Sequence, residues 1–594
     1  MKKQLNLVVA ASIALGVAAC SPGSPTPTGK DSLKGSAAQL DSASYAALTP
    51  LQQYQVANKL TSALFTGVPA NDFFVVGSIG ADTSKLAVAG KYSNLLGKVR
   101  KDLNTSLPDD PLPTETRTPV KIPLSGDATT RSRSKNEIDD FIDGNTTKKI
   151  VARYSFDDNR PTQYPLAYLH ETPLSDEFFA RWMAYKLVNT IMFSPAEEID
   201  SADQLDVQTL YENMVIALKA DTPIRSIILA HEKSESNWKR FRSPEDNTRE
   251  MIEIYLGLFD RDADVPKASK ACKNWALSDE DAGYKLMKGP NENTEPQLIL
   301  DSYYVTTCDE VFAVISNHPL VIPRVTTVLI DHMFGVEYDA DTRSALARDI
   351  AASNPTTFRD LFEAILFSKE FLLNMERPKW FEESYFNAAA RVYWRSTAGM
   401  TTAGTPPVPV PRASSFFRDI NTNANNNNID GSLPQMYQPA FSLKLGRWPT
   451  VPGDALATSY QHNGLRSTFF VRSNAKLASD PTFDAAITAT QGWGPELTAD
   501  VTKLSMDDFV AYMFISVLGR APTAEEASTL KQVINSARLT TSSSSADCTA
   551  PSSSSNNTSG CQQLFSEANT NTRAMVVMDY LSRLPETYFY NAVN

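Results

Sequence analysis

Helix-like spacing of apolar residues dominates the chain. Apolar side chains recur every three or four positions in several stretches, which is the period of an amphipathic helix. Four helices are predicted in the middle of the chain, over residues 178–192, 210–218, 224–231 and 244–259. The first follows the acidic pair Asp176 and Glu177, which favours a helix N-terminus, and the last is expected to begin after the cap residue Ser243. Because strand-like alternation is scarce and short, the sequence predicts a mainly α fold, a multi-helix array with long irregular loops.

Two sections of the C-terminal half resemble copies of one three-helix unit. In each copy a glycine marks a tight turn after the first helix, and a leucine and an isoleucine follow at equal offsets. The matched positions are Gly335 with Gly519, Leu346 with Leu530, and Ile350 with Ile534. The third helices are expected over residues 358–371 and 573–589, with a Ser- and Asn-rich insert at 540–560 in the second copy. Duplication is the prediction, and chance similarity between amphipathic helices is the alternative.

Changes in composition divide the chain into five segments. Residues 401–411 and 421–428 are rich in Pro, Thr and Asn, which is typical of loops, so we place a domain boundary there. The predicted segments are a signal peptide at 1–19, a lipidated cysteine and flexible tether at 20–40, a main helical domain at 41–400, an irregular connection at 401–470, and a C-terminal helical domain at 471–594.

The first residues have the composition of an export signal. Two lysines precede an apolar run at 7–19, which is too short to span a membrane as a helix. Cys20 follows small residues and resembles the bacterial lipobox, in which the thiol takes up a diacylglycerol; an ordinary secretory signal with an incidental cysteine is the alternative. Ser21 resembles the outer-membrane sorting choice of Gram-negative lipoproteins. We therefore expect an exported protein that the lipid on Cys20 holds at the outer membrane.

Charge and cysteine content restrict the partners and cofactors. The chain carries 56 basic and 68 acidic residues, a formal net charge of −12, which disfavours nucleic acid as a partner. In an oxidising compartment the four cysteines beyond Cys20 are expected to pair. Three pairings are open, and we favour Cys272–Cys308 and Cys548–Cys561 because both are local. The sequence has no c-type haem motif, zinc spacing or phosphate-binding glycine loop, so no cofactor or metal is predicted.

A series of short motifs occurs in a fixed order between residues 175 and 470. The motifs are Asn247-Thr248-Arg249-Glu250-Met251-Ile252-Glu253-Ile254-Tyr255, Asp264-Val265, Trp275, Asn317-His318-Pro319, Arg324, Leu366-Phe367-Ser368-Lys369-Glu370-Phe371, Gln438-Pro439 and Gly446-Arg447-Trp448-Pro449. Their order and approximate spacing resemble the bacterial domain-of-unknown-function-1800 family. The chain departs from that family at Tyr255, where the family often has His, and at Asn274, where it has Gly. The resemblance implies an exported, mainly helical protein without an established activity.

A second resemblance lies near the C-terminus. Leu518-Gly519-Arg520-Ala521-Pro522-Thr523 followed by Glu526 is similar to a helical module at the ends of large exported proteins that often carry c-type haem. This chain lacks the Cys-x-x-Cys-His motif that attaches such a haem. The module therefore implies a helical C-terminal domain and no cofactor.

A group of charged residues on the last of the four predicted helices is the first candidate for chemistry. Glu250 and Glu253 are one helical turn apart, and with Asp246 and Arg249 they share one arc opposite Met251, Ile252, Tyr255 and Phe259. Two carboxylates beside an arginine are able to serve as general acid and base or to bind a cation. The alternatives are a solvated face and a buried ion network with a structural role.

Two other candidates are weaker. Residues 260–264 place carboxylates at alternate positions, as a calcium loop does, but Val265 and Ala271 stand where such a loop needs Gly and Glu. His318 precedes a proline and is expected to cap the following helix. Because no acid or nucleophile adjoins it in the sequence, its predicted role is structural.

These observations lead to two hypotheses about function. The leading hypothesis is a non-enzymatic, surface-tethered lipoprotein that binds an envelope protein or a polysaccharide, since no nucleophile, metal set or cofactor motif is recognisable. The alternative is a hydrolase of an envelope or external polymer that uses Glu250 and Glu253 with His318 or Arg249. A cleft that joins these four residues favours the hydrolase, and their burial or dispersal favours the binding protein.

Overall fold

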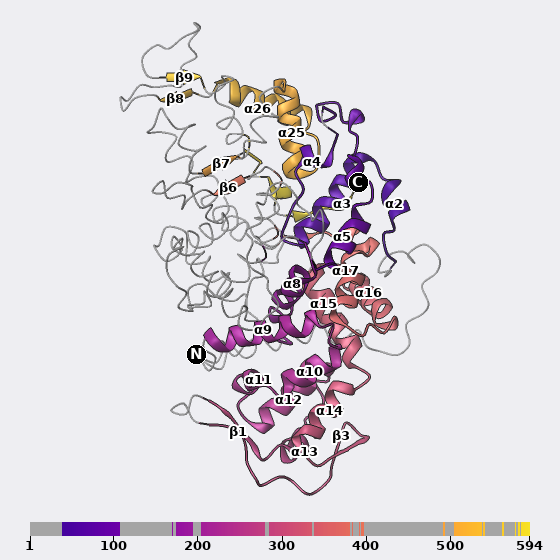
Figure 1. Cartoon of the computed structure of the whole chain (residues 1–594), viewed down its shortest axis with the longest axis vertical. Helices are drawn as coiled ribbons and strands as arrows, with labels where there is room; N and C mark the ends of the chain where they lie inside the picture. The colour runs from indigo at the N-terminus through magenta and orange to yellow at the C-terminus, as the bar shows by residue number, and fades with distance from the viewer. Residues whose placement is uncertain are drawn as a thin grey trace.

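Helices form most of the computed structural model of the chain (Figure 1). It describes residues 38–75, 77–106, 169, 174–193, 204–278, 284–335, 338–379, 383, 391, 394–396, 491–493, 504–536, 538–540, 561–563, 577, 580–581, 584–587 and 589–593. The predicted signal peptide, Cys20 and most of the predicted tether lie outside these residues. The prediction of a mainly α fold is confirmed, because the strands are only two or three residues long.

Four helices open the described chain. They are α2 (Ser42–Ala46), α3 (Pro50–Ala63), α4 (Ala70–Phe73) and α5 (Leu95–Leu103), with the 3-10 turns η1 (Thr83–Lys85) and η2 (Gly90–Tyr92) between the last two. α3 begins with a capping box, in which Thr49 and Gln52 exchange side-chain to backbone hydrogen bonds. Most of its residues are buried, including the polar Asn58 and Lys59. α3 is therefore a core helix that carries polar side chains into the interior.

The four helices predicted in the middle of the chain are confirmed. They are α8 (Asp176–Val188), α9 (Gln204–Lys219), α10 (Ile224–Glu232) and α12 (Pro244–Leu256), accompanied by the shorter α11 (Glu235–Arg240) and α13 (Val265–Ala271). Ser243 caps α12 as expected, by accepting a hydrogen bond from the backbone of Asp246. The expected end at Phe259 is wrong, because Gly257 adopts the left-handed conformation (φ 69°) and stops the helix there. Phe259 is consequently 48% exposed and not part of the buried face.

Two hairpins and a disulfide build one end of the molecule, next to α13 and α14 (Cys308–Asn317) (Figure 1). β1 (Trp275–Leu277) pairs with β2 (Leu286–Lys288), and β3 (Gln297–Ile299) pairs with β4 (Tyr303–Val305), both antiparallel. The disulfide joins Cys272, directly after α13, to Cys308, the first residue of α14, so this predicted pairing is confirmed. Cys548 lies outside the described residues, and the pairing Cys548–Cys561 stays a prediction.

The first two helices of the predicted repeat have matching bounds. They are α15 (Val321–Phe334) and α16 (Ala340–Ala352) in the first copy, and α25 (Met506–Leu518) and α26 (Ala524–Ser536) in the second. Gly335 and Gly519 both have positive φ, and the 13-residue helix that follows starts at the same offset from each glycine. The matched apolar residues are buried in both copies: Leu346, Ile350, Leu530 and Ile534.

The third helix differs between the two copies. In the first copy it is α17 (Phe358–Leu366), followed by a π-helical turn, η4 (Glu370–Asn374). In the second copy residues 573–589 are described only in part, and they end in the 3-10 turn η7 (Pro585–Thr587) and the strand β10 (Phe589–Tyr590). The expected helix through residue 589 is therefore wrong at its C-terminal end, where Pro585 disfavours helix continuation.

The two predicted helical domains share one hydrophobic core. β10 pairs antiparallel with β5 (Arg377–Pro378), and the backbone N–H of Val593 donates to the carbonyl oxygen of Leu373 at 2.8 Å. Buried apolar side chains form a single cluster that extends from Leu40 to Tyr590. The predicted connection at 401–470 lies outside the described residues. Two further short hairpins are β6 (Trp394–Ser396) with β7 (Gln491–Trp493) and β8 (Arg538–Thr540) with β9 (Cys561–Gln563).

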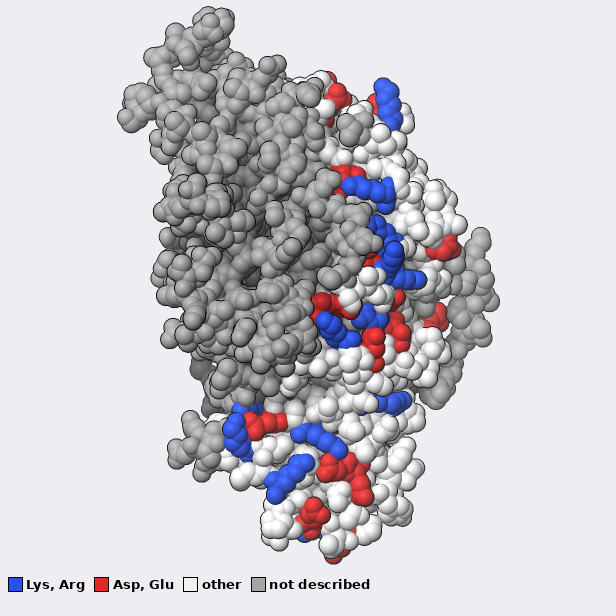
Figure 2. All heavy atoms as spheres, in the orientation of Figure 1, with Lys and Arg blue, Asp and Glu red and all other residues white. Residues whose placement is uncertain are grey.

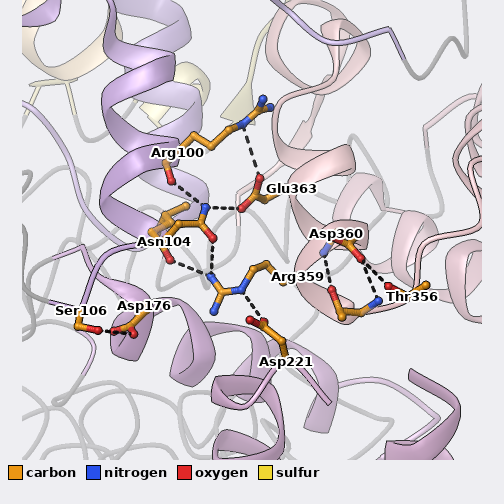
Figure 3. Close-up of polar contacts among 11 residues, drawn as sticks. Arg100, Asn104, Ser106, Asp176, Asp221, Thr356, Arg359, Asp360 and Glu363 are labelled. Carbon is orange, nitrogen blue, oxygen red and sulfur yellow. Dashed lines mark hydrogen bonds and ion pairs between the residues drawn. The ribbon is translucent and has the colours of Figure 1, made fainter. Parts of the chain in front are cut away.

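Arg359 lies where α5, α17 and the turn before α10 meet (Figure 3). Its guanidinium donates to the carbonyl oxygen of Leu103 at 2.8 Å and to Asp221 Oδ1 at 2.7 Å. Asn104 accepts a further bond from Arg359 at 3.1 Å and donates to Glu363 at 2.7 Å. The network joins segments that are distant in the sequence, and its charged groups have partners within it, so its role is structural.

On the face drawn in Figure 2, basic and acidic residues are interspersed. Within the described residues no single helix is long and apolar enough to cross a bilayer. α14 and α15 together have a sufficient length and composition, but the pair is bent by 67°.

Candidate functional site

The predicted carboxylates occupy the outer face of α12. Glu250 and Glu253 are half-buried, and Asp246 is exposed beside them. Burial raises the pKa of Glu250 to about 7, and the negative charges of Glu253 and Asp246 act in the same direction. Arg249 pairs at the surface with Asp262, at 3.0 Å between Nη1 and Oδ1. The four residues of the predicted arc therefore share a face, but not a buried ion network.

His318 is held by other contacts. Its Nδ1 accepts a hydrogen bond from the backbone of Leu320 at 3.2 Å, and its ring packs against Tyr303 with 5.8 Å between centroids. Arg225 donates to the carbonyl oxygen of His318 at 2.9 Å. Burial lowers the pKa of His318, and the charge of Arg225 lowers it further. His318 shapes the turn between α14 and α15, and no contact among the described residues joins it to the carboxylates of α12.

The acidic run at 260–264 is engaged by arginines. Arg261 donates to both carboxylate oxygens of Asp301, at 2.8 and 2.9 Å, and its Nε donates to Asp264 at 2.6 Å. Asp262 accepts from Arg249. In the part of the chain that the structure describes, no group of three or more His, Cys, Asp or Glu side chains is placed to hold a metal ion.

A polar cavity of about 240 Å³ lies beside α3, where the end of the chain returns to it (Figure 1). Three separate parts of the sequence line it: Gln55, Asn58 and Lys59 of α3; Lys379 and Arg391; and Leu518, Gly519, Arg520, Glu586 and residues 589–592. Neither this cavity nor the apolar one described below is lined by the carboxylates of α12 or by His318. The sequence candidates are thus not brought together, and a different set of residues is.

Cations dominate the described lining of this cavity. Lys59, Lys379, Arg391 and Arg520 face a single acid, Glu586. Glu586 accepts a hydrogen bond from Arg520 at 3.0 Å, and Arg520 also pairs with Glu526, which is not in the lining. Burial lowers the pKa of Lys59 and of Lys379 to about 7; the charges of Glu376 and Glu370 oppose the shift at Lys59, and at Lys379 the charge of Arg391 lowers the pKa further while Glu383 opposes it. An anion in the cavity would favour the charged forms of both lysines.

Both lysines have N–H donors that make no hydrogen bond within the described residues. Lys59 Nζ donates to the carbonyl oxygen of Met375 at 2.9 Å, and Lys379 Nζ donates to that of Thr587 at 3.3 Å. An ammonium group has three N–H donors, so each of these lysines has further donors beyond its one bond within the described residues. Such donors suit the oxygens of a carboxylate or phosphate.

Two amide side chains add unpaired acceptors. Asn58 is only 8% exposed, and its Oδ1 has no hydrogen-bond donor among the described residues. The nearby hydroxyl of Tyr54 donates to the carbonyl oxygen of Val68 at 3.0 Å instead. Gln55 uses its Nε2 to donate to the carbonyl oxygen of Gly519, and its buried Oε1 is also without a described donor. A buried acceptor left unpaired costs about 1–3 kcal/mol, so a ligand that donates to either oxygen would gain stability.

Gly519 closes the turn after α25 against this lining. Its φ is +73°, which favours glycine. A Cβ at this position would meet Asn58 Nδ2 and Gln55 Cγ at 3.5 Å and Arg391 Nη2 at 3.8 Å. The three side chains therefore converge on one backbone turn, at which the positive φ, and not a lack of space, favours glycine.

Arg520 fixes the same turn. It donates to both carboxylate oxygens of Glu526, at 2.8 and 2.7 Å, and hydrogen bonding to Arg520 lowers the pKa of Glu526 to about 2. Thr523 and Glu526 also cap α26 reciprocally, through bonds of 3.2 and 2.7 Å. The motif that runs from Leu518 to Glu526 is thus a capped turn whose glycine adjoins the cavity.

A buried ion triad supports the wall formed by Tyr590. Arg377 donates to both carboxylate oxygens of Glu383 at 2.8 Å, and Lys186 Nζ lies 3.5 Å from Glu383. These side chains are at most 1% exposed. The guanidinium of Arg377 also lies over the Tyr590 ring, 4.9 Å from its centroid. Removal of one partner would leave a buried charge uncompensated, so the triad is expected to fix the position of Arg377 over the Tyr590 ring.

A second cavity of about 420 Å³ lies between α9, α10 and α11. Its lining is mainly apolar, with Leu210, Met214 and Ile227 among its residues. His231 is the buried titratable group of this lining, and burial lowers the pKa of His231 to about 3, so the ring is neutral at pH 7. The charge of the first cavity sets it apart as the more specific site.

The polar cavity has almost no signature in the sequence. Lys59 and Asn58 have the spacing of a solvated helix face, and Lys379 and Arg391 belong to no motif. Gly519 and Arg520 belong to a predicted turn, but their motif does not predict a binding site. The one indication is α3, which begins with a capping box and has polar residues at positions where a core helix normally has apolar residues.

Comparison with known proteins does not assign this arrangement to a family. No protein-family model, curated protein or solved structure matches the chain. The likeness to the domain-of-unknown-function-1800 family therefore stays a prediction that rests on the order of the motifs, and the function has to be argued from the site itself.

Proposed function

We propose that this chain is a lipid-anchored envelope protein that binds a small anionic ligand in the polar cavity beside α3. The observation that carries the proposal is the pair of buried lysines, Lys59 and Lys379, in the lining of a cavity whose one described acid, Glu586, is hydrogen-bonded to Arg520. Buried charges normally have partners, and a bound carboxylate or phosphate supplies one.

The size of the cavity limits the ligand. Pockets that hold drug-sized molecules measure roughly 300–1,000 Å³. At about 240 Å³ this cavity suits a smaller molecule, such as an organic acid or one unit of a polymer. The interspersed charges on the face drawn in Figure 2 do not form the continuous basic track that a long polyanion needs. The ligand is accordingly a small anion or the end of an envelope polysaccharide.

The anchor is part of the same proposal. Cys20 carries the lipid, and residues 20–37 act as a tether that positions the helical body at the outer membrane. The predicted tether is too long by residues 38–40, because Leu40 is buried and its N–H donates to the carbonyl oxygen of Phe367. Replacement of Cys20 by Ser is expected to release the protein from the membrane fraction, and mass spectrometry of the wild-type N-terminus should show a diacylated cysteine. An unmodified Cys20 in the mature protein would contradict the anchoring and leave the cavity proposal intact.

The hydrolase alternative has one observation in its favour. A carboxyl with a pKa of about 7, as in Glu250, suits a general acid. However, the described contacts of His318 are with other residues, and Arg249 pairs with Asp262. The separation of His318 from Glu250, Glu253 and Arg249 favours the binding protein.

Calorimetric titration of the detergent-solubilised mature protein tests the binding proposal. We use sodium D-glucuronate as the probe, at pH 6, where both cavity lysines are charged. Wild type is expected to bind it, and Lys379→Met to bind it at least tenfold more weakly, because one cation is lost. Lys85→Met is the matched control, since that lysine is 75% exposed in η1 and away from the cavity. Equal affinities of the three proteins would contradict the proposal.

A further inference from the structure

We infer that the ligand is a polyhydroxy acid of the sugar-acid class, an inference that rests on the anion binding proposed above. The cavity presents two kinds of unmet hydrogen-bonding group. Among the described residues, the ammonium groups of Lys59 and Lys379 make one hydrogen bond each, while Gln55 Oε1 and both amide atoms of Asn58 make none. A ligand that satisfies both kinds has a negative charge and hydroxyl groups in the same small molecule.

The acceptors exclude a simple anion as the best ligand. A carboxylate or sulfate offers only acceptor oxygens, which match the lysines but leave Gln55 Oε1 and Asn58 Oδ1 unpaired. Each unpaired buried acceptor costs about 1–3 kcal/mol. A hydroxyl group donates to such an oxygen and accepts from a neighbouring N–H, so it serves both sets of groups.

The cations exclude an ammonium group as the source of those donors. An amino acid also joins a carboxylate to N–H donors, but its positive charge would lie among Lys59, Lys379 and Arg391. Repulsion between like charges at short range in a partly buried site is unfavourable. A neutral sugar satisfies the acceptors but leaves the lysines without a counter-charge. A hydroxylated acid meets both conditions.

The geometry of the lining agrees with a ligand of one sugar ring. Asn58 Nδ2, Gln55 Cγ and Arg391 Nη2 lie within 4 Å of the Gly519 Cβ position, so the two amide side chains and a guanidinium adjoin each other at one end. Phe589 is half-buried in the same lining and offers an apolar surface for the C–H face of a sugar. The volume of about 240 Å³ leaves no space for a drug-sized molecule beside it.

Affinity for a set of small probes tests the inference on the full mature protein. D-Glucuronate combines charge and hydroxyls, acetate has the charge alone, and D-glucose has the hydroxyls alone. We expect D-glucuronate to bind at least tenfold more tightly than either of the others, because only it serves the lysines and the amide oxygens together. Acetate that binds as tightly as D-glucuronate would overturn the inference and leave the anion proposal standing. The absence of binding by any probe would overturn both.

One substitution locates the hydroxyl contact. Asn58→Leu keeps the approximate size of the side chain and removes the acceptor, so affinity for D-glucuronate should fall about tenfold while affinity for acetate stays the same. Asn317→Leu is the matched control, an exposed asparagine on α14. Unchanged D-glucuronate affinity in Asn58→Leu would overturn the assignment. If Asn58→Leu does not fold, Gln55→Leu tests the second acceptor, and the probe series needs no variant.

A final comparison distinguishes the two sources of a sugar acid. A disaccharide that ends in D-glucuronate represents the terminus of an envelope polysaccharide, and free D-glucuronate represents a solute. Binding of both assigns the site to a polymer end, and binding of the monosaccharide alone assigns it to a free sugar acid. Both results support the polyhydroxy-acid class, and rejection of both contradicts it.

Discussion

Gln55 Nε2 donates a hydrogen bond of 3.1 Å to the carbonyl oxygen of Gly519, a residue 464 positions further along the chain. This bond joins α3 to the turn after α25, which is the first helix of the second copy in the predicted repeat. The other amide atom, Gln55 Oε1, has no hydrogen-bond donor among the described residues. The contact between these two residues is thus where the fold and the proposed site depend on each other.

Gly519→Ala should weaken both stability and ligand binding. The positive φ of +73° is strained for alanine, although the added methyl group would meet Asn58 Nδ2 and Gln55 Cγ only at the van der Waals distance of 3.5 Å. We expect a loss of about 1 kcal/mol in the free energy of unfolding, measured by chemical denaturation, with reduced affinity for D-glucuronate. Gly90→Ala is the control, because no atom lies within 4 Å of its Cβ position and its φ is not strained. Equal stability of the two variants would contradict this role of Gly519.

Ligand binding should be coupled to proton uptake. Lys59 and Lys379 both have a pKa of about 7, so each is partly neutral at pH 7. A bound anion favours their charged forms and raises their pKa, and protons are therefore taken up from solution. Affinity for D-glucuronate is expected to fall as the pH rises above 7. The binding enthalpy should differ between PIPES and Tris buffers at pH 7, and an identical enthalpy in both would mean that neither lysine changes its protonation.

Glu250 should make stability depend on pH. Its pKa is raised from an ordinary value of 4.5 to about 7, so the folded state binds this proton more tightly than the unfolded state does. The contribution is fully present below about pH 4.5 and is lost as the pH rises toward 7. Glu250→Gln stays neutral, and at pH 8 it should be more stable than wild type by about 1 kcal/mol, a value reduced for solvent screening.

Thermal denaturation at pH 4 and pH 8 measures this effect. The difference in melting temperature between Glu250→Gln and wild type should be larger at pH 8. Glu245→Gln is the control on the same helix, because its side chain is 65% exposed. Melting temperatures of Glu250→Gln and wild type that differ equally at both pH values would count against the raised pKa.

Loss of the Cys272–Cys308 disulfide should destabilise the end of the molecule that carries the hairpins. The bond closes a loop with a sequence separation of 36, for which loop-closure entropy gives about 3–4 kcal/mol. Both cysteines are buried, so a Cys272→Ala and Cys308→Ala double variant keeps apolar groups at the two positions. Urea denaturation should show the loss without a change in D-glucuronate affinity, since neither residue lines the polar cavity. A stability equal to that of wild type would show that the bond contributes nothing.

Local features of this fold were predictable from the sequence, because their causes are local. Ser243 caps α12 as expected, since a cap needs only the residues of the first turn. The repeat is visible in the sequence because a glycine with positive φ follows the first helix in both copies, Gly335 and Gly519, and the apolar positions that follow keep their offsets. The end of α12 was missed because the left-handed Gly257 stops a helix whose apolar pattern continues to Phe259.

The polar cavity was not predictable from the sequence. Its lining comes from α3, from Lys379 and Arg391, and from the end of the chain, so it exists only after long-range packing. In the sequence, Asn58 and Lys59 look like members of a solvated helix face. Their burial follows from the position of α3 inside the core, which neither spacing nor composition reveals. Conversely, Glu250 and His318 belong to motifs that the sequence shows, but in the structure they have different neighbours.

The most direct test is a crystal structure of the mature protein grown with D-glucuronate. The sugar acid is expected in the cavity beside α3, with its carboxylate on Lys59, Lys379 or Arg391 and a hydroxyl group donating to Asn58 Oδ1 or Gln55 Oε1. A cavity filled only by water at saturating D-glucuronate, or a sugar bound with its carboxylate away from these cations, would contradict the proposed function.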